Sequence, residues 1–185
     1  MVFFLTFIIF ITIIIFIFSS KKFSPIPYFP SQPVDIPKII KALNLKDSQT
    51  VFDLGAGDGI IIFTAAKSSF QRKLNTEFIA VEINPVLILI LHFRRLFHQN
   101  KKNIKIVYGD IFKMDFESFM YRRGTALSLP TFYLYISPWF LERIIRNLKL
   151  EIRNFSIVSY MYSIKSLKNK EKIIQGKNSI FIYNL

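Results

Sequence analysis

The first 18 residues form an almost unbroken apolar run. Thr6 and Thr12 are its only polar side chains, and residues 1–20 contain no Asp, Glu, Lys or Arg. As a helix, 18 residues would be about 27 Å long, which is close to the thickness of the hydrocarbon layer of a bilayer. A cleaved signal peptide would carry a basic start and small residues before the cut, and this run has neither. Residues 1–20 are therefore predicted to form an uncleaved, single-pass transmembrane anchor.

Two lysines, Lys21 and Lys22, follow this run directly, and no basic residue precedes it. Basic residues beside an apolar span favour the cytoplasmic side of a membrane. The predicted location is therefore a membrane, with the rest of the chain on its cytoplasmic side.

Residues 21–37 contain five of the eight prolines in the chain, and a run so rich in proline is extended rather than helical. It is predicted to be a linker. The pattern leaves two interpretations open: a stiff spacer between membrane and domain, or a segment whose Tyr28 and Phe29 line a pocket.

Beyond a short amphipathic helix at residues 36–45, brief apolar runs alternate with helical patterns. This alternation is typical of βαβ units and of a sheet that is buried on both faces. One α/β domain is predicted over residues 38–185. The predicted strands are 50–54, 77–83, 104–108, 131–136 and 155–160, the helices are 58–69, 85–99 and 138–150, and a closing hairpin covers 172–175 and 179–183.

Composition excludes several classes of function. The 185 residues include no Cys and only two His, so a disulfide framework, a thiolate zinc site and a Cys nucleophile are excluded. No carboxylate stands between His92 and His98 at the spacing of metal ligands, and no metal site is predicted.

The chain is strongly basic, with 25 Lys and Arg against 12 Asp and Glu and a net charge of +13. Three basic pairs, Arg94–Arg95, Lys101–Lys102 and Arg122–Arg123, could bind RNA, anionic lipid or nothing. Lipid is the favoured partner because a membrane anchor is predicted upstream.

Candidate chemistry is concentrated in residues 51–59, VFDLGAGDG, where a strand ends in a glycine loop and runs into a helix. Glycines let the backbone approach a ligand closely, and the helix start offers free N–H donors. The spacing differs from the dinucleotide fingerprint, and no P-loop Gly-Lys-Ser/Thr follows. Asp53 would repel a pyrophosphate but suits a ligand that carries an ammonium group.

Two further acids follow the next predicted strands. Glu82 ends the second strand, where an acid accepts hydrogen bonds from ribose hydroxyls. Asp110 follows the third strand, beside apolar Ile111 and Phe112 that could hold an adenine ring. Each acid alone could be a helix cap or a solvated loop residue. Together they border one crevice at the carboxyl ends of the strands, which favours a nucleoside-type ligand.

These motifs resemble the class I S-adenosylmethionine-dependent methyltransferases. A narrower resemblance is to the membrane-anchored protein-lysine methyltransferases of mitochondria that act on the ATP synthase c subunit and on the adenine nucleotide translocase, and to their prokaryotic relatives. The matching segments are 27–30 (PYFP), 53–59 (DLGAGDG), 82–85 (EINP) and 110–113 (DIFK). One departure is Ile60, since those relatives usually carry Arg there.

The resemblance implies a Rossmann-like sheet of seven strands with the last strand antiparallel, and S-adenosylmethionine as the cofactor. It places the glycine loop around the methionine part, Glu82 at the ribose and Asp110 at the adenine. The implied cofactor-binding residues are Asp53, Gly55, Ala56, Gly57, Asp58, Gly59, Glu82, Ile83, Asp110 and Ile111.

The segment after the fourth strand lies where amino-group methyltransferases often place Asn/Asp-Pro-Pro-Tyr/Phe. Here Ser137 replaces the amide or acid, and Trp139 and Phe140 follow Pro138. Ser137, Trp139 and Phe140 are the candidate catalytic residues. They could equally be a helix cap with core aromatics.

The leading hypothesis is a membrane-anchored methyltransferase that modifies lysine amines of a membrane protein. Methylation of RNA, or of a lipid or quinone headgroup, would use the same cofactor half and stays open. A non-catalytic membrane-bound scaffold is the remaining alternative. The intact Asp53, Glu82 and Asp110 argue against it.

Overall fold

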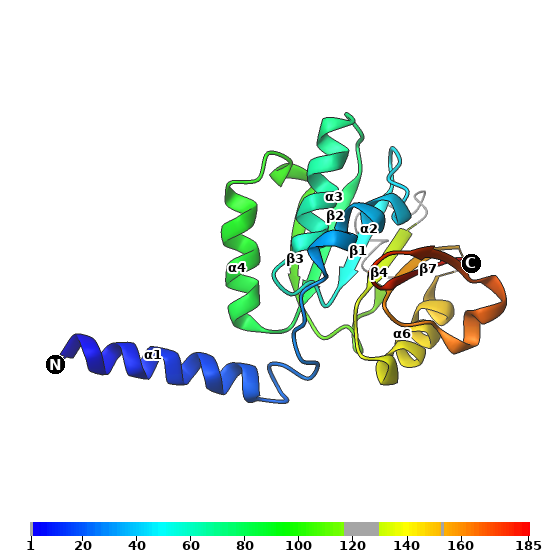
Figure 1. Ribbon diagram of the computed structural model, residues 1–185. Coiled ribbons are helices and arrows are strands. Elements are labelled where there is room, and N and C mark those ends of the chain that lie inside the picture. The colour runs from blue at the N-terminus through cyan, green and yellow to red at the C-terminus, as the bar shows by residue number, and fades with distance from the viewer. Residues whose placement is uncertain (1, 117–129, 153) are drawn as a thin grey trace.

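A seven-stranded mixed sheet, with helices packed against it, forms the domain in the computed structural model, which describes residues 2–116, 130–152 and 154–185 (Figure 1). Its strand order is β3-β2-β1-β4-β5-β7-β6. β1 to β5 pair in parallel, and β7 runs antiparallel between β5 and β6. The strands are β1 Thr50–Leu54, β2 Glu77–Glu82, β3 Ile104–Tyr108, β4 Pro130–Leu134, β5 Ser156–Tyr160, β6 Lys172–Gln175 and β7 Ser179–Asn184. The α/β prediction with an antiparallel last strand is confirmed.

The central strands are covered on both faces, which is why their sequences are apolar throughout rather than alternating. Every residue of β1 and β4 is buried. Successive side chains of a strand point to opposite faces, so Val51 enters one core cluster, which also holds Ile39 and Leu91, while Phe52 enters the other, which holds Leu141. The sheet thus divides the interior into two cores and carries its strand ends to a common edge.

The α-helices with bounds in the described residues are α1 Val2–Ser19, α2 Ile36–Ala42, α3 Ile60–Gln71, α4 Pro85–Leu96 and α6 Pro138–Glu151. The predicted helix starts at Pro85 and Pro138 are confirmed. Asn84 caps α4 by accepting hydrogen bonds from two backbone N–H groups. α3 begins two residues later than predicted because Gly59 takes a left-handed conformation, with φ of 78°, directly before it.

The apolar helix α1 leaves the domain and presents side chains such as Phe3 and Phe16 to the surroundings (Figure 1). Among residues 3–19, Ile14 and Ile17 are partly buried and the others are exposed. Over residues 2–116, 130–152 and 154–185, no helix is long and apolar enough to cross a membrane, and the transmembrane prediction for residues 1–20 is not supported.

Asp35 joins the start of the domain to its final hairpin. Its fully buried carboxylate accepts hydrogen bonds from the Tyr160 hydroxyl at 2.7 Å and from the backbone N–H groups of Lys177 at 2.6 Å and Asn178 at 2.9 Å. Burial alone would raise the pKa of Asp35, but these donors hold it below its ordinary value. The ionised carboxylate therefore stabilises the fold.

Replacing Asp35 should destabilise the protein. Asp35→Ala leaves buried donors without a partner and is expected to lower the free energy of unfolding by about 3 kcal/mol at pH 7. Since the folded-state pKa is depressed, this contribution is complete above about pH 4 and is lost as the pH falls through the folded-state value. Urea unfolding of the detergent-solubilised chain, followed by circular dichroism at several pH values, measures both effects.

Asp47→Ala is the matched control, because Asp47 is exposed and accepts one backbone hydrogen bond, from Asn75. It should cost less than about 1 kcal/mol. Equal losses in the two variants would contradict the role given to Asp35.

Candidate functional site

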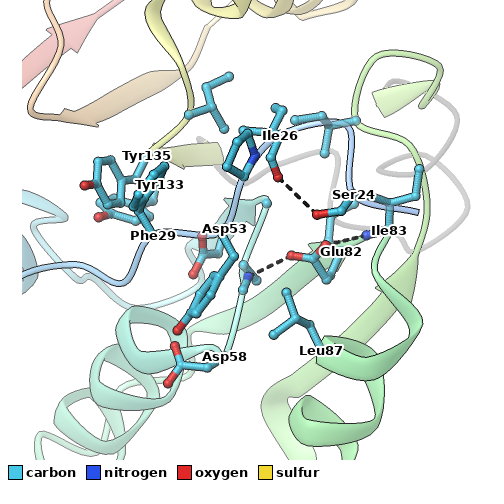
Figure 2. Close-up of a pocket in the computed structure, with 18 of the residues that line it drawn as sticks. Ser24, Ile26, Phe29, Asp53, Asp58, Glu82, Ile83, Leu87, Tyr133 and Tyr135 are labelled. Carbon is cyan, nitrogen blue, oxygen red and sulfur yellow. Dashed lines mark hydrogen bonds between the residues drawn. The ribbon is translucent and has the colours of Figure 1, made fainter. Parts of the chain in front are cut away.

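A pocket lies where the carboxyl ends of β1, β2, β3 and β4 meet, and the segment 24–31 closes one side of it (Figure 2). Parallel strands bring residues that are distant in sequence to this edge. Nine of the ten predicted cofactor-binding residues line the pocket: Asp53, Gly55, Ala56, Gly57, Asp58, Glu82, Ile83, Asp110 and Ile111. The tenth, Gly59, lies behind it, against the side chains of Leu91 and Phe63.

The loop after β1 depends on glycine for its shape. Gly55, Gly57 and Gly59 all have positive φ angles, of 84°, 58° and 78°. A Cβ atom at Gly57 would lie 2.5 Å from the ring of Tyr28, so the ring and the loop fit only without a side chain there. The absence of a side chain at Gly57 therefore lets the strap pack closely on the glycine loop.

Glu82 is held in place by backbone donors. Its Oε2 accepts the N–H of Gly57 at 2.8 Å, and its Oε1 accepts those of Ile83 at 2.8 Å and Asn84 at 2.9 Å (Figure 2). The side chain is only 7% exposed. The carboxylate is therefore fixed at the pocket wall before any ligand arrives, with oxygen lone pairs still free to accept hydroxyl groups.

Asp53 is a buried acid beside the glycine loop. Burial, together with the nearby charges of Glu82 and Asp58, raises the pKa of Asp53 to about 8. Before a ligand binds, the carboxyl group is therefore mostly neutral at pH 7. A ligand with an ammonium group would favour its ionised form.

Asp58 is the centre of a cluster that the sequence did not reveal. Arg94 of α4 donates to the Asp58 carboxylate at 2.7 Å and to its backbone carbonyl at 2.6 Å, and its guanidinium lies over the Phe63 ring. Burial, together with the nearby Asp58 carboxylate, raises the pKa of Tyr28 to about 12. Arg94 of α4 thus supplies the cation that holds the glycine loop. The residue directly after the third glycine, Ile60, carries no charge.

Asp110 follows the third strand, as expected. Its Oδ1 accepts the Phe112 N–H at 2.9 Å, and its Oδ2 lies 3.8 Å from the Lys113 ammonium. Ile111 is buried next to it. A carboxylate and an apolar surface therefore adjoin at the third strand end.

The segment 24–31, which we call the strap, crosses the pocket between α1 and the domain. Ser31 fixes its far end through a buried 2.8 Å hydrogen bond with the Tyr133 hydroxyl. Tyr28 and Phe29 both line the pocket, which confirms the pocket interpretation of this segment. Figure 2 shows Phe29 beside Tyr133 and Tyr135. These three rings and that of Tyr28 form the aromatic part of the lining, which we call the aromatic entrance.

The structure places Ser137, Trp139 and Phe140 beside this pocket and not in its wall. Trp139 is 83% exposed, and Phe140 packs on Phe112 with ring centroids 5.2 Å apart. The preceding residues, Tyr135 and Ile136, line the pocket instead. The catalytic role of the three residues stays a prediction.

Two other predictions concern metals and basic pairs. Arg122–Arg123 lies outside the described residues. Within the part of the chain that the structure describes, no group of His, Asp and Glu side chains could hold a metal ion.

Residues 28–165 match the family described as ribosomal RNA adenine dimethylase, so the match covers residues 28–31 of the strap and the strand ends that form the pocket.

Curated relatives include both protein and RNA methyltransferases. The chain is 28% identical over 105 residues to the ATP synthase c-subunit lysine N-methyltransferase of Xenopus laevis, covering 57% of this chain and 42% of that protein. It is 35% identical over 82 residues to the "Probable ribosomal RNA small subunit methyltransferase A" of Methanosarcina mazei, covering 44% of this chain and 27% of that protein. The chain thus spans less than half the length of these relatives.

Solved structures share the fold. An RNA methyltransferase from Salinibacter ruber in complex with S-adenosyl-L-homocysteine superposes with a TM-score of 0.67 at 16% identity, over 84% of this chain and 93% of that one. A methyltransferase from Geobacter sulfurreducens, also in complex with S-adenosyl-L-homocysteine, gives 0.52 at 15% identity, over 85% of this chain and 60% of that one. At these identities the likeness concerns the fold alone.

Loss of the Glu82 carboxylate should weaken cofactor binding. Hydrogen bonds to a charged group contribute about 1.5–3 kcal/mol each, so Glu82→Ala is expected to lower the affinity for S-adenosylhomocysteine at least tenfold. Titration calorimetry measures the affinity, and circular dichroism checks the fold. Glu77→Ala is the control, since Glu77 stands at the other end of β2 in an ion pair with Lys105. If Glu82→Ala binds like wild type, the assignment of the pocket is wrong.

Cofactor binding should release a proton through Asp53. The raised pKa leaves the carboxyl group protonated at pH 7 before a ligand binds, and a bound ammonium would ionise it. Affinity should therefore increase as the pH rises from 6 to about 8. In the absence of ligand the sign is opposite for stability: the folded-state pKa exceeds the unfolded one, so the ligand-free domain loses stability as the pH rises from about 4 to about 8.

Calorimetry at pH 7 in buffers of different ionisation enthalpy counts the released protons. Wild type should release close to one proton and Asp53→Asn none. Binding without proton release by the wild type would exclude this role for Asp53.

Proposed function

The chain belongs to the ribosomal RNA adenine dimethylase family, and from this premise we propose that it is an S-adenosylmethionine-dependent methyltransferase that modifies lysine amines of a membrane protein. The choice of acceptor rests on the position of the strap, because this segment follows the apolar helix α1 and also forms a wall of the pocket. An acceptor that reaches the pocket therefore comes close to α1.

The pocket has the groups that this cofactor requires. Glu82 is fixed to accept the ribose hydroxyls, Asp53 suits the ammonium of the methionine part, and Asp110 with Ile111 suits the adenine. The cofactor supplies a methyl group on a sulfonium that is already a reactive electrophile. The protein therefore needs mainly to hold a neutral nucleophile in line with that methyl group.

A lysine amine is such a nucleophile only after it loses a proton, because its ordinary pKa is about 10.4. The aromatic entrance, formed by Tyr28, Phe29, Tyr133 and Tyr135, would surround the amine with ring faces and exclude water. Removal from water disfavours the charged form and lowers the pKa of the amine. Ser137, Trp139 and Phe140 lie beside the pocket and are not part of its lining, so any role in catalysis would be at its rim.

Membrane association is proposed from α1. Its side chains are apolar on all sides and mostly exposed, and it carries no charge. An all-round apolar helix requires cover from lipid or protein. Lipid is the proposed cover, and Lys21 and Lys22 at its end favour the cytoplasmic side for the domain. Confinement to a membrane raises the local concentration of membrane-protein acceptors.

RNA is the second candidate acceptor. It is supported by the family match, by the relatives described as RNA methyltransferases and by the net charge of +13. Tyr135, which follows β4, lines the pocket and offers a ring on which a flipped base could stack, while Trp139 is 83% exposed and lies outside the lining. The choice of lysine over RNA therefore rests on the position of the strap beside α1.

Radioactive S-adenosylmethionine, added with the full chain to membranes of the source cell, distinguishes these acceptors. The label should enter protein, and acid hydrolysis should recover it as methylated lysine. Glu82→Ala is the matched control and should abolish labelling. A chain without residues 2–19 should still bind cofactor but lose labelling of membrane proteins.

Label chiefly in RNA, or in organic-extractable lipid, would replace the lysine proposal by one of its alternatives. Equal labelling of soluble and membrane lysines by the truncated chain would show that α1 does not select the acceptor.

A further inference from the structure

The outer face of α4 is a second apolar surface. Leu89, Phe93, Leu96 and Phe97 are 70%, 64%, 61% and 78% exposed. Leu89, Phe93 and Leu96 lie on one side of the helix by their spacing, and Phe97 is the C-cap residue that follows it. The rings of Phe93 and Phe97 touch with centroids 5.2 Å apart. Soluble domains rarely leave such large side chains exposed together, and such a patch marks an interaction surface. We call these four residues the outer stripe.

The outer stripe is not needed for the core. Leu87 and Leu91, on the opposite side of α4, are buried against the sheet. Arg94 holds Asp58 of the glycine loop, and Arg95 donates to the Ile104 carbonyl at 2.7 Å. The inner side of α4 therefore accounts for the packing of the domain, and the side chains of the outer stripe stay exposed.

The position of α1 indicates what covers the outer stripe. α1 contacts α4, and Figure 1 shows α1 leaving the domain on the side where α4 is the outermost helix and running crosswise to it. The two exposed apolar surfaces thus lie on the same side of the molecule. A soluble partner or a second copy that covered α4 would leave α1 exposed. A bilayer covers both at once.

Charge supports the same partner. Residues 85–103 contain no Asp or Glu, and Lys101 and Lys102 lie exposed just beyond α4. Lys21 and Lys22 stand exposed at the corresponding place after α1. Lysines next to an apolar face bind anionic headgroups while the apolar side chains enter the acyl boundary.

We propose that the outer stripe of α4 rests in the interface of an anionic lipid bilayer and forms a second membrane contact in addition to α1. This proposal rests on the proposed membrane association of α1. One helix alone would leave the domain free to rotate above the membrane. Two crossed contacts fix its orientation and hold the strap and the pocket entrance at the level of the headgroups.

Spin labels test this arrangement in the full chain, because the sequence contains no Cys and each introduced cysteine is the sole thiol. Phe97→Cys, Leu150→Cys and Phe10→Cys place one nitroxide on the outer stripe, on α6 and on α1, at positions that are 78%, 80% and 58% exposed. Each labelled protein is reconstituted in vesicles of phosphatidylcholine and phosphatidylglycerol. Collision rates with oxygen, which concentrates in lipid, and with a polar nickel chelate report the depth.

The label at 97 should collide with oxygen at least threefold more often, relative to nickel, than the label at 150, and vesicles without phosphatidylglycerol should reduce this difference. A label at 10 in lipid with one at 97 in water would overturn the second contact and leave the first intact. Labels at 10 and 97 both in water would overturn membrane association itself. Strong dipolar coupling between labels at 97 of neighbouring molecules would assign the stripe to a dimer and overturn the proposal.

Discussion

The pocket depends on one buried carboxylate that ties two strand ends together. Glu82 ends β2, and by accepting the Gly57 N–H it fixes the loop that follows the neighbouring β1. Its other oxygen accepts two N–H groups of the turn into α4. The backbone amides would otherwise face the pocket without partners, and a buried unpaired donor costs about 1–3 kcal/mol. The loop, the turn and the start of α4 therefore take their positions from the same side chain.

The sheet could be predicted from sequence because its strands are short, apolar and separated by turn residues. The bounds of β1 and β3 agree residue for residue with the predictions of 50–54 and 104–108. The cofactor residues were equally accessible, since glycine spacing and acids at strand ends are local signals that the parallel topology brings to one edge. The ends of helices were less accurate, and the helix predicted to reach residue 45 ends at Ala42.

The contacts that complete the pocket could not be read from the sequence, because they join segments far apart in the chain. The sequence around Asp58 does not indicate that its carboxylate will form an ion pair with Arg94 of α4. The pattern after β4 predicts a role for Trp139 at the site, but the Trp139 side chain is exposed to solvent and Tyr135 lines the pocket instead. Local composition identifies an aromatic residue, but the direction of its side chain depends on where the preceding strand stops.

The hydrogen bonds of the Asp35 carboxylate can form only late in the synthesis of the chain. They join Asp35 to residues that are 142 and 143 positions later. A ribosome adds about 5–20 residues per second, so α1 emerges many seconds before Lys177 and Asn178 are made. The apolar helix can therefore reach a bilayer while the domain behind it is still open. Under the proposed membrane association, targeting would precede closure of the fold, and the newly made chain would complete its pocket already at the membrane surface.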